Sequence, residues 1–167
     1  MRSALALALL GVMFAGTASA ATGTPGTLTV KANVAQTCVV TGGTLDFGAY
    51  DPTSASPVTG SATVSVRCTK NTVAAVALNQ GAFATGTSSC ASPARQMANG
   101  AERLGYALYS NAGLTLAWGC DAPTNDVDFT STSTVTPNVM TVYGRIPAGQ
   151  DVGFGNYQDT VSVDVTF

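Results

Sequence analysis

Alternating apolar and polar residues mark both ends of the chain. Within residues 27–34, every second position is apolar: Leu28, Val30, Ala32 and Val34. Within residues 157–167, one face carries Tyr157, Val161, Val163, Val165 and Phe167. Because successive side chains of a strand point to opposite sides, each segment is predicted to be a half-buried strand.

Shorter apolar stretches lie between these two segments. They predict strands near residues 45–47, 62–68, 73–78, 104–109, 115–118 and 139–146. Turn sequences such as Asn79-Gln80-Gly81 and Pro147-Ala148-Gly149 separate them. Residues 88–103 are expected to form a short helix or an irregular loop, and residues 121–137 a long loop or hairpin. Many short strands with such turns predict an all-β fold, a β-sandwich.

The predicted last strand runs to the final residue, so nothing in the sequence covers its outer edge. The predicted first strand follows the flexible stretch of residues 21–26. Exposed sheet edges pair readily with other chains. A free strand and an uncovered edge together suggest strand addition between molecules. The alternative is that both end segments pair inside their own domain.

The first twenty residues resemble a secretory signal peptide. Arg2 precedes an apolar run that is too short to span a bilayer, and Ala18-Ser19-Ala20 supplies the small residues of a cleavage site. The alternative, a retained membrane anchor, requires about 20 apolar residues. We therefore expect cleavage after Ala20, leaving one domain of ordinary length that is either soluble or assembled outside the inner membrane.

The charge pattern argues against nucleic acid and anionic membranes as partners. Without Arg2, the chain has six basic and nine acidic residues, and no cluster of Lys or Arg. Binding to a phosphate backbone or to an anionic membrane surface depends on such clusters. We expect no nucleic-acid partner.

Four cysteines behind a signal peptide indicate two disulfides. They are Cys38, Cys68, Cys90 and Cys120, and the sequence leaves three pairings open. We favour Cys38–Cys68 with Cys90–Cys120, two separate loops of similar length that would each contribute about 3–4 kcal/mol. A metal site is a poor alternative, because the chain has no histidine and the spacings are long.

Catalytic constellations are missing from the sequence. Without histidine, neither a Ser-His-Asp nor a Cys-His arrangement can form. Four oxygen-bearing residues could bind calcium, but they do not match the EF-hand spacing, and a solvated loop is the simpler interpretation: Asp121, Asn125, Asp126 and Asp128. Trp118 is expected in the core beside a disulfide. We expect no enzyme activity, no cofactor and no metal.

Three segments carry a resemblance to a known family. They are the alternating strand of residues 27–38, the stretch Leu45-Asp46-Phe47-Gly48-Ala49-Tyr50-Asp51-Pro52, and residues 155–167. In this order and spacing, residues 21–167 resemble the spore coat protein U family and, within it, the major pilins of archaic chaperone–usher pili of the Csu type.

The resemblance implies an incomplete immunoglobulin-like sandwich that lacks its final strand, formed by residues 37–167. A periplasmic chaperone would lend a strand, and an outer-membrane usher would exchange it for the N-terminal extension, residues 21–36, of the next identical subunit. The donor residues would be Leu28, Val30, Ala32 and Val34. The last strand and its groove would be lined by Val161, Val163, Val165 and Phe167. The Phe167 carboxylate would anchor basic chaperone residues, and Cys38–Cys68 would link the first two strands.

The chain departs from the family pattern at Thr166, where such pilins often have tyrosine, and the usual glycine upstream could be Gly153 or Gly155. These departures affect the register in which the chaperone strand would pair with the last strand, and they leave the prediction of that last strand unchanged. The implied function is a shaft subunit, exported through the periplasm into surface fibres for attachment and biofilm formation. The alternatives are a single-domain surface adhesin or binding module and a spore-coat component.

Overall fold

The computed structural model describes residues 19–167. The chain divides between Asn33 and Val34, and the two parts are considered separately. The predicted signal peptide falls almost entirely outside the described residues. Among the residues described, no helix has the length and apolarity needed to cross a membrane.

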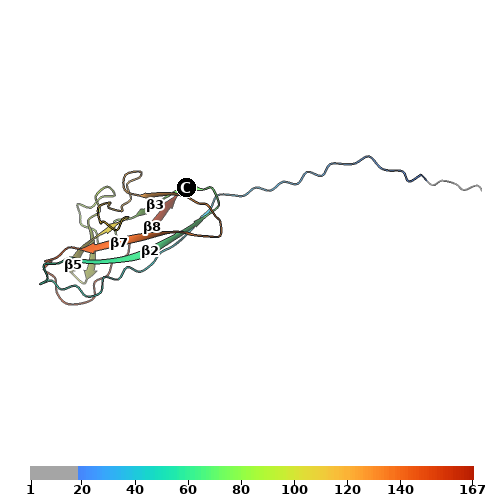
Figure 1. Cartoon of the computed structure of the whole chain (residues 1–167). Coiled ribbons are helices and arrows are strands. Elements are labelled where there is room, and N and C mark those ends of the chain that lie inside the picture. Colours follow the sequence, from blue (N-terminus) through green and yellow to red (C-terminus); the bar gives the residue numbers. More distant parts are fainter. Residues whose placement is uncertain (1–18) are drawn as a thin grey trace, which may run out of the picture. The chain divides into compact units, whose positions relative to one another are not determined.

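Residues 34–167 form an all-β structure of two sheets. The strands in chain order are β1 Cys38–Thr41, β2 Val58–Cys68, β3 Val73–Leu78, β4 Arg95–Asn99, β5 Glu102–Tyr109, β6 Val127–Thr130, β7 Asn138–Ile146 and β8 Val163–Thr166. One sheet has the order β1-β2-β7-β5-β4 and the other β6-β3-β8. Figure 1 shows β3 and β8 together on one side, and β2 and β7 on the other.

The connections match an immunoglobulin-like sandwich. In that fold, strands A, B, E and D form one sheet, and C, F and G the other. Here the strands that correspond to A, B, E and D are β1, β2, β7 and β5, in that order. The strands that correspond to C and F are β3 and β8. Among the described residues, no strand pairs with the outer edge of β8, where G would lie.

The core lies between the sheets, because the strands alternate as their sequences predict. On β2, Val64, Val66 and Cys68 are buried, while Arg67 between them is exposed. Val76 and Leu78 of β3 face them from the other sheet, and Trp118 fills the space between with only 1% of its surface exposed. The indole Nε1 of Trp118 donates to the carbonyl of Val76 at 2.8 Å, which confirms its predicted place in the core.

Four of the predicted inner strands are confirmed. Residues 62–68, 73–78, 104–109 and 139–146 all lie within β2, β3, β5 and β7. Residues 88–103 contain β4 rather than a helix, and residues 121–137 contain β6. Residues 115–118 do not form a strand, because only Ala117 bridges to Tyr109 before Trp118 turns into the core.

The end segments differ from their predictions. Residues 27–34 have no strand partner in the described chain and are exposed rather than half-buried. Only Val163–Thr166 of the last segment forms a strand, because the preceding residues cross from one sheet to the other. Gln158 bridges to Ala98 of β4, whereas Val165 pairs with Val76 of β3.

Candidate functional site: an open groove beside the last strand

A groove opens between the sheets beside the segment that leads into β8, and it reaches the first residue of that strand, Val163. It consists of two adjoining cavities of about 620 Å³ each. The residues that line both cavities are Leu45, Phe47, Met97, Tyr157 and Gln158. Its floor is the sandwich core, including Leu78, Tyr106 and Leu108. The groove is therefore a place where the core of the sandwich is left open, lined by both apolar and polar groups.

One wall of the groove is the irregular segment of residues 42–50. The sequence predicted a strand at residues 45–47, and this is wrong. The segment lies flat on the inner face of the larger sheet, because two cross-strand glycines, Gly60 and Gly144, leave room for it. A Cβ atom on Gly144 would approach the Phe47 Cζ to 2.6 Å. Glycine inside a strand often marks such a close approach, a signal that could have identified this wall.

Tyr50 fixes the far end of this wall. Its hydroxyl donates to the Pro147 carbonyl at 3.0 Å and accepts from the Gln150 amide at 2.9 Å. The Gln150 side chain bonds both backbone groups of Gly105, at 2.7 and 2.9 Å. The Gln150 side chain therefore supplies hydrogen bonds to β5 beyond Ile146, the residue at which β7 ends.

The opposite wall is the C-terminal segment, residues 157–163. Tyr157, Val161 and Val163 line the main cavity. Asp159 anchors the segment: its Oδ1 accepts from the backbone amides of Ala82 and Thr160 at 2.8 Å, and its Oδ2 accepts from the Tyr106 hydroxyl at 2.6 Å. Burial, reinforced by the hydrogen bond to Asp159, raises the pKa of Tyr106.

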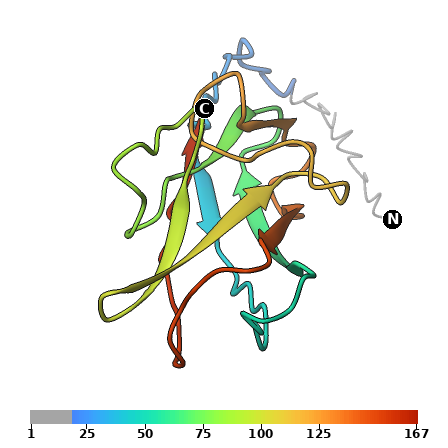
Figure 2. The ribbon, with the colours of Figure 1, turned by 90° about the vertical axis from the view of Figure 1, so that its left-hand side faces the viewer.

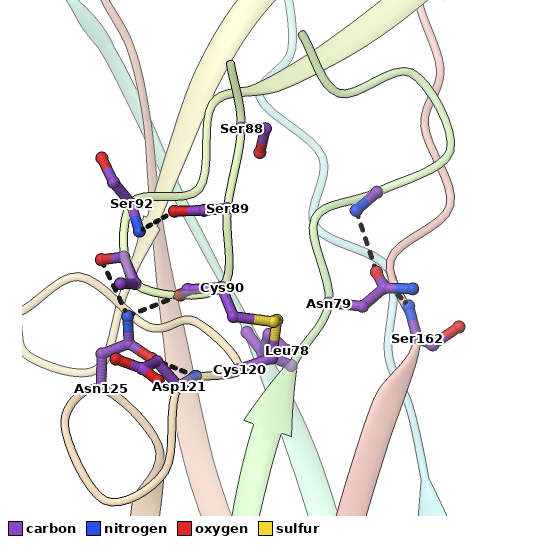
Figure 3. The surroundings of a disulfide bond; sticks show 12 residues. Leu78, Asn79, Ser88, Ser89, Cys90, Ser92, Cys120, Asp121, Asn125 and Ser162 are labelled. Carbon is purple, nitrogen blue, oxygen red and sulfur yellow. Dashed lines mark hydrogen bonds between the residues drawn. A yellow bond between two sulfur atoms is a disulfide. The ribbon is translucent and has the colours of Figure 1, made fainter. Parts of the chain in front are cut away.

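A second anchor ties this wall to the loop after β3. The Asn79 side chain accepts from the amides of Ser162 and Gly81 at 3.0 and 2.9 Å, and the Asn79 amide donates to the Ser162 carbonyl (Figure 3). The sequence did not single out Asn79 or Asp159, because nothing local distinguishes them from other polar loop residues.

Arg95 supports the same loop from inside the protein. Only 2% of its surface is exposed, and burial lowers the pKa of its guanidinium. Its Nε donates to the Asn79 carbonyl and its Nη2 to the carbonyls of Leu78 and Trp118, at 2.8 to 2.9 Å. Hydrogen bonds of this kind satisfy a buried charge. Arg95 thus holds two backbone segments in place behind the groove wall, residues 78–79 and the segment around Trp118.

Both disulfides have the pairing favoured from the sequence, Cys38–Cys68 and Cys90–Cys120. The first joins β1 to β2 at paired positions. The second joins the loops before β4 and β6, where Asn125 donates to the carbonyl of Cys90 at 2.8 Å (Figure 3). The Asn125 side chain also accepts a hydrogen bond from the Asp121 backbone amide, so it stabilises the conformation of this loop. Within residues 19–167, no three His, Cys, Asp or Glu side chains converge on a possible metal site.

The predicted groove residues occupy different positions. Val161 and Val163 line the cavity, Val165 is half-buried against the core, and Phe167 is 54% exposed. The predicted donor residues belong to no strand in the described chain. Leu28, Val30 and Val34 are 79–88% exposed, and Ala32 is exposed as well.

This arrangement can bind an extended peptide. β8 has one backbone edge that no strand of residues 19–167 pairs with, and the groove that begins at Val163 includes apolar side chains. Strand addition uses these two features: backbone hydrogen bonds supply affinity and the apolar sites supply specificity. The groove residues that the sequence did not assign to it are Leu45, Phe47, Met97 and Tyr106.

Comparisons with known proteins agree with this geometry. A family profile described as the Spore Coat Protein U domain matches residues 24–164. Protein U of Myxococcus xanthus is 37% identical over 161 residues, which cover 90% of this chain and 88% of that protein.

A solved structure of related fold is the CsuC–CsuE chaperone–tip adhesion subunit pre-assembly complex from the archaic chaperone–usher Csu pili of Acinetobacter baumannii. The match has a TM-score of 0.57 and 25% identity, and it covers 80% of this chain but 40% of that chain. This chain therefore spans less than half of the solved chain. The family profile extends over most of the sequence, and the chain belongs to the spore coat protein U family.

Proposed function

We propose that this protein is a structural subunit of an archaic chaperone–usher pilus and polymerises by donor-strand exchange. The observation that carries the proposal is the edge of β8, unpaired among the described residues, beside an open groove with an apolar floor, in a chain that also has an exposed alternating segment. One subunit supplies Leu28, Val30, Ala32 and Val34, and the next supplies the groove.

The physical basis is that the donor segment leaves its apolar side chains exposed, while the groove leaves apolar core residues uncovered and β8 with an edge that no described strand pairs with. Apolar burial contributes about 25 cal/mol per Å², and each backbone hydrogen bond adds about 1 kcal/mol net. A ligand that binds the folded groove also stabilises the folded subunit, so binding and folding reinforce each other. We expect dissociation of the assembled fibre to be very slow.

The route of assembly follows from the same groove. Before polymerisation, a periplasmic chaperone would occupy the edge of β8, and an outer-membrane usher would replace it by the next subunit. The related solved structure is a chaperone–subunit complex, which supports this step. The product would be a surface fibre that serves attachment and biofilm formation, with this protein as the repeating shaft subunit and with no catalytic role.

The test is deletion of residues 21–34, with deletion of residues 21–26 as the matched control. The longer deletion removes all four donor residues, whereas the control keeps them. We expect the control to form a ladder of polymers that resists denaturant at room temperature and collapses on boiling. The longer deletion should give only chaperone-bound monomers, and a normal ladder from it would rule out donor-strand exchange.

Two other roles have specific support. The matched solved chain belongs to a tip adhesion complex, and the family name refers to a spore coat. Labelling with a subunit-specific antibody distinguishes the three roles of shaft subunit, tip subunit and coat component. A shaft subunit labels along the whole fibre, a tip subunit labels one end, and a coat component labels the spore or cyst surface without fibres.

A further inference from the structure

The two ends of the sandwich differ in chemistry. The register of β2 and β7 defines them: Val66 pairs with Asn138 at one end, and Val58 with Ile146 at the other. The root end contains residues 35–37, the start of β7 and the end of β8. The far end contains the loops of residues 44–57 and 147–156. In Figure 1 the C-terminus marks the root end, where β2 also ends.

The far end has an exposed phenylalanine. Phe154 lies between Gly153 and Gly155 at the edge of the second cavity and is fully exposed. Four exposed carboxylates belong to the same end: Asp46, Asp51, Glu102 and Asp151. They outnumber the arginines there, Arg103 and Arg145, and Arg103 already donates to the carbonyls of Gly100 and Glu102.

The root end has the complementary features. Three valines are exposed: Val39 by 53%, Val135 by 81% and Val139 by 60%. Arg67 and Lys70 are exposed beside them. No acidic side chain occurs in residues 34–41, 65–73 or 130–139, although the carboxylate of Phe167 follows the end of β8 at this end. The outward carboxylates of Asp128 and Asp164 lie further along the smaller sheet.

Donor-strand exchange would bring these unlike ends together. Every strand ladder in the sandwich is antiparallel, so a strand added to β8 is expected to be antiparallel as well. Because β8 runs toward the root end, such a donor would end, at its residue Val34, beside the far end of the acceptor. The root end of the donating subunit follows directly.

The connection between donor and body is short. The carbonyl of Ala35 accepts from the Thr69 hydroxyl at 3.1 Å, and the amide of Thr37 donates to the same hydroxyl at 3.2 Å. The body is therefore fixed from the residue after Val34. One residue spans at most about 3.6 Å, so the two ends cannot separate widely once the donor is in place.

We propose that neighbouring copies of this chain make a second contact, in which Phe154 of one subunit packs on the root-end valines of the next. Arg67 and Lys70 face the carboxylates of the far end around it. This contact rests on the proposed donor-strand assembly. It sets the angle and stiffness of the joint between subunits, because a single strand alone would leave the joint free to bend.

Cysteine cross-linking tests the contact in assembled fibres. The four native cysteines are all paired, so new cysteines can be introduced without free thiols nearby. Phe154→Cys is combined in turn with Val39→Cys, Val135→Cys or Val139→Cys, and with Leu116→Cys as the control, because Leu116 is 60% exposed beside the end of β5. We expect at least one valine pair to give a ladder that survives boiling until reductant is added. If none exceeds the control, the proposal is overturned.

A second measurement does not depend on new disulfides. A variant that carries Val39→Ser, Val135→Ser and Val139→Ser should keep the boiling-sensitive ladder, since these valines line neither cavity of the groove, while the persistence length of its fibres in electron micrographs falls at least two-fold. Leu116→Ser fibres should match the wild type. Unchanged stiffness in the triple valine variant would refute the second contact alone. Loss of the ladder from wild-type fibres would instead refute donor-strand exchange.

Discussion

The two ends of the chain have the same alternating pattern and opposite structural roles. Residues 27–34 expose their apolar face and have no partner strand in the described chain. Residues 157–167 are fixed to the sandwich through Asp159 and Ser162 and pair with β3, yet β8 keeps one edge free. Alternation therefore identifies a segment able to form a strand, but it does not show whether that segment pairs within its own domain.

The largest effect is expected from a charge on the donor face. Val30→Asp should abolish polymerisation, because an unpaired carboxylate buried in an apolar groove costs several kcal/mol. Thr29→Asp is the matched control, since it adds the same charge to the other face. Denaturing gels of unboiled fibres give the result. Equal ladders from both variants would contradict the proposal that the Val30 side chain enters the groove of the neighbouring subunit.

The anchor behind the acceptor wall should show the next largest effect. Arg95→Met leaves the carbonyls of Leu78, Asn79 and Trp118 without their donor, and breaking such a buried charged network typically costs about 3–5 kcal/mol. Urea unfolding measures the loss, with the exposed Arg145→Met as the control. If both variants unfold at the same urea concentration, Arg95 does not support the C-terminal segment.

The opposite wall depends on a smaller steric fit. Gly144→Ala places a Cβ against the Phe47 ring, and overpacking of this kind costs about 1–3 kcal/mol. Gly42→Ala meets no atom within 4 Å and should leave stability nearly unchanged. We expect Gly144→Ala fibres to dissociate faster in denaturant as well. Dissociation at the wild-type rate would show that residues 42–50 are not a wall of the bound groove.

The smallest effect concerns alkaline pH. Because burial raises the pKa of Tyr106, the folded state keeps its phenol neutral where the unfolded state ionises, above about pH 10. The stability from this group is therefore complete below that pH and is lost as the pH rises further.

Urea unfolding of Tyr106→Phe against wild type between neutral pH and pH 11 checks this. The variant should be less stable at neutral pH, because it loses the hydrogen bond to Asp159, and the difference should shrink above pH 10. A constant difference would mean that Tyr106 does not stay neutral in the folded protein.

The sequence predicted much of the fold but little of the site. Period-two patterns located β2, β3, β5 and β7, because each buries one face against the core. They failed at residues 45–47, where the apolar side chains of Leu45 and Phe47 are half-buried against the core without a paired backbone. They also could not show that Asp159 and Tyr106, distant in sequence, share a hydrogen bond.

What the sequence determined by itself was local: strands, turns, the absence of histidine, the family resemblance, and an alternating segment at each end. Three features required the tertiary structure. Among the described residues, no strand pairs with the outer edge of β8. Residues 42–50 and 157–163 form the two walls of the groove, and Arg95 supports the loop that holds the second wall. The physical reason is that alternation records which side chains avoid water. Backbone pairing and close packing depend instead on residues far apart in the chain.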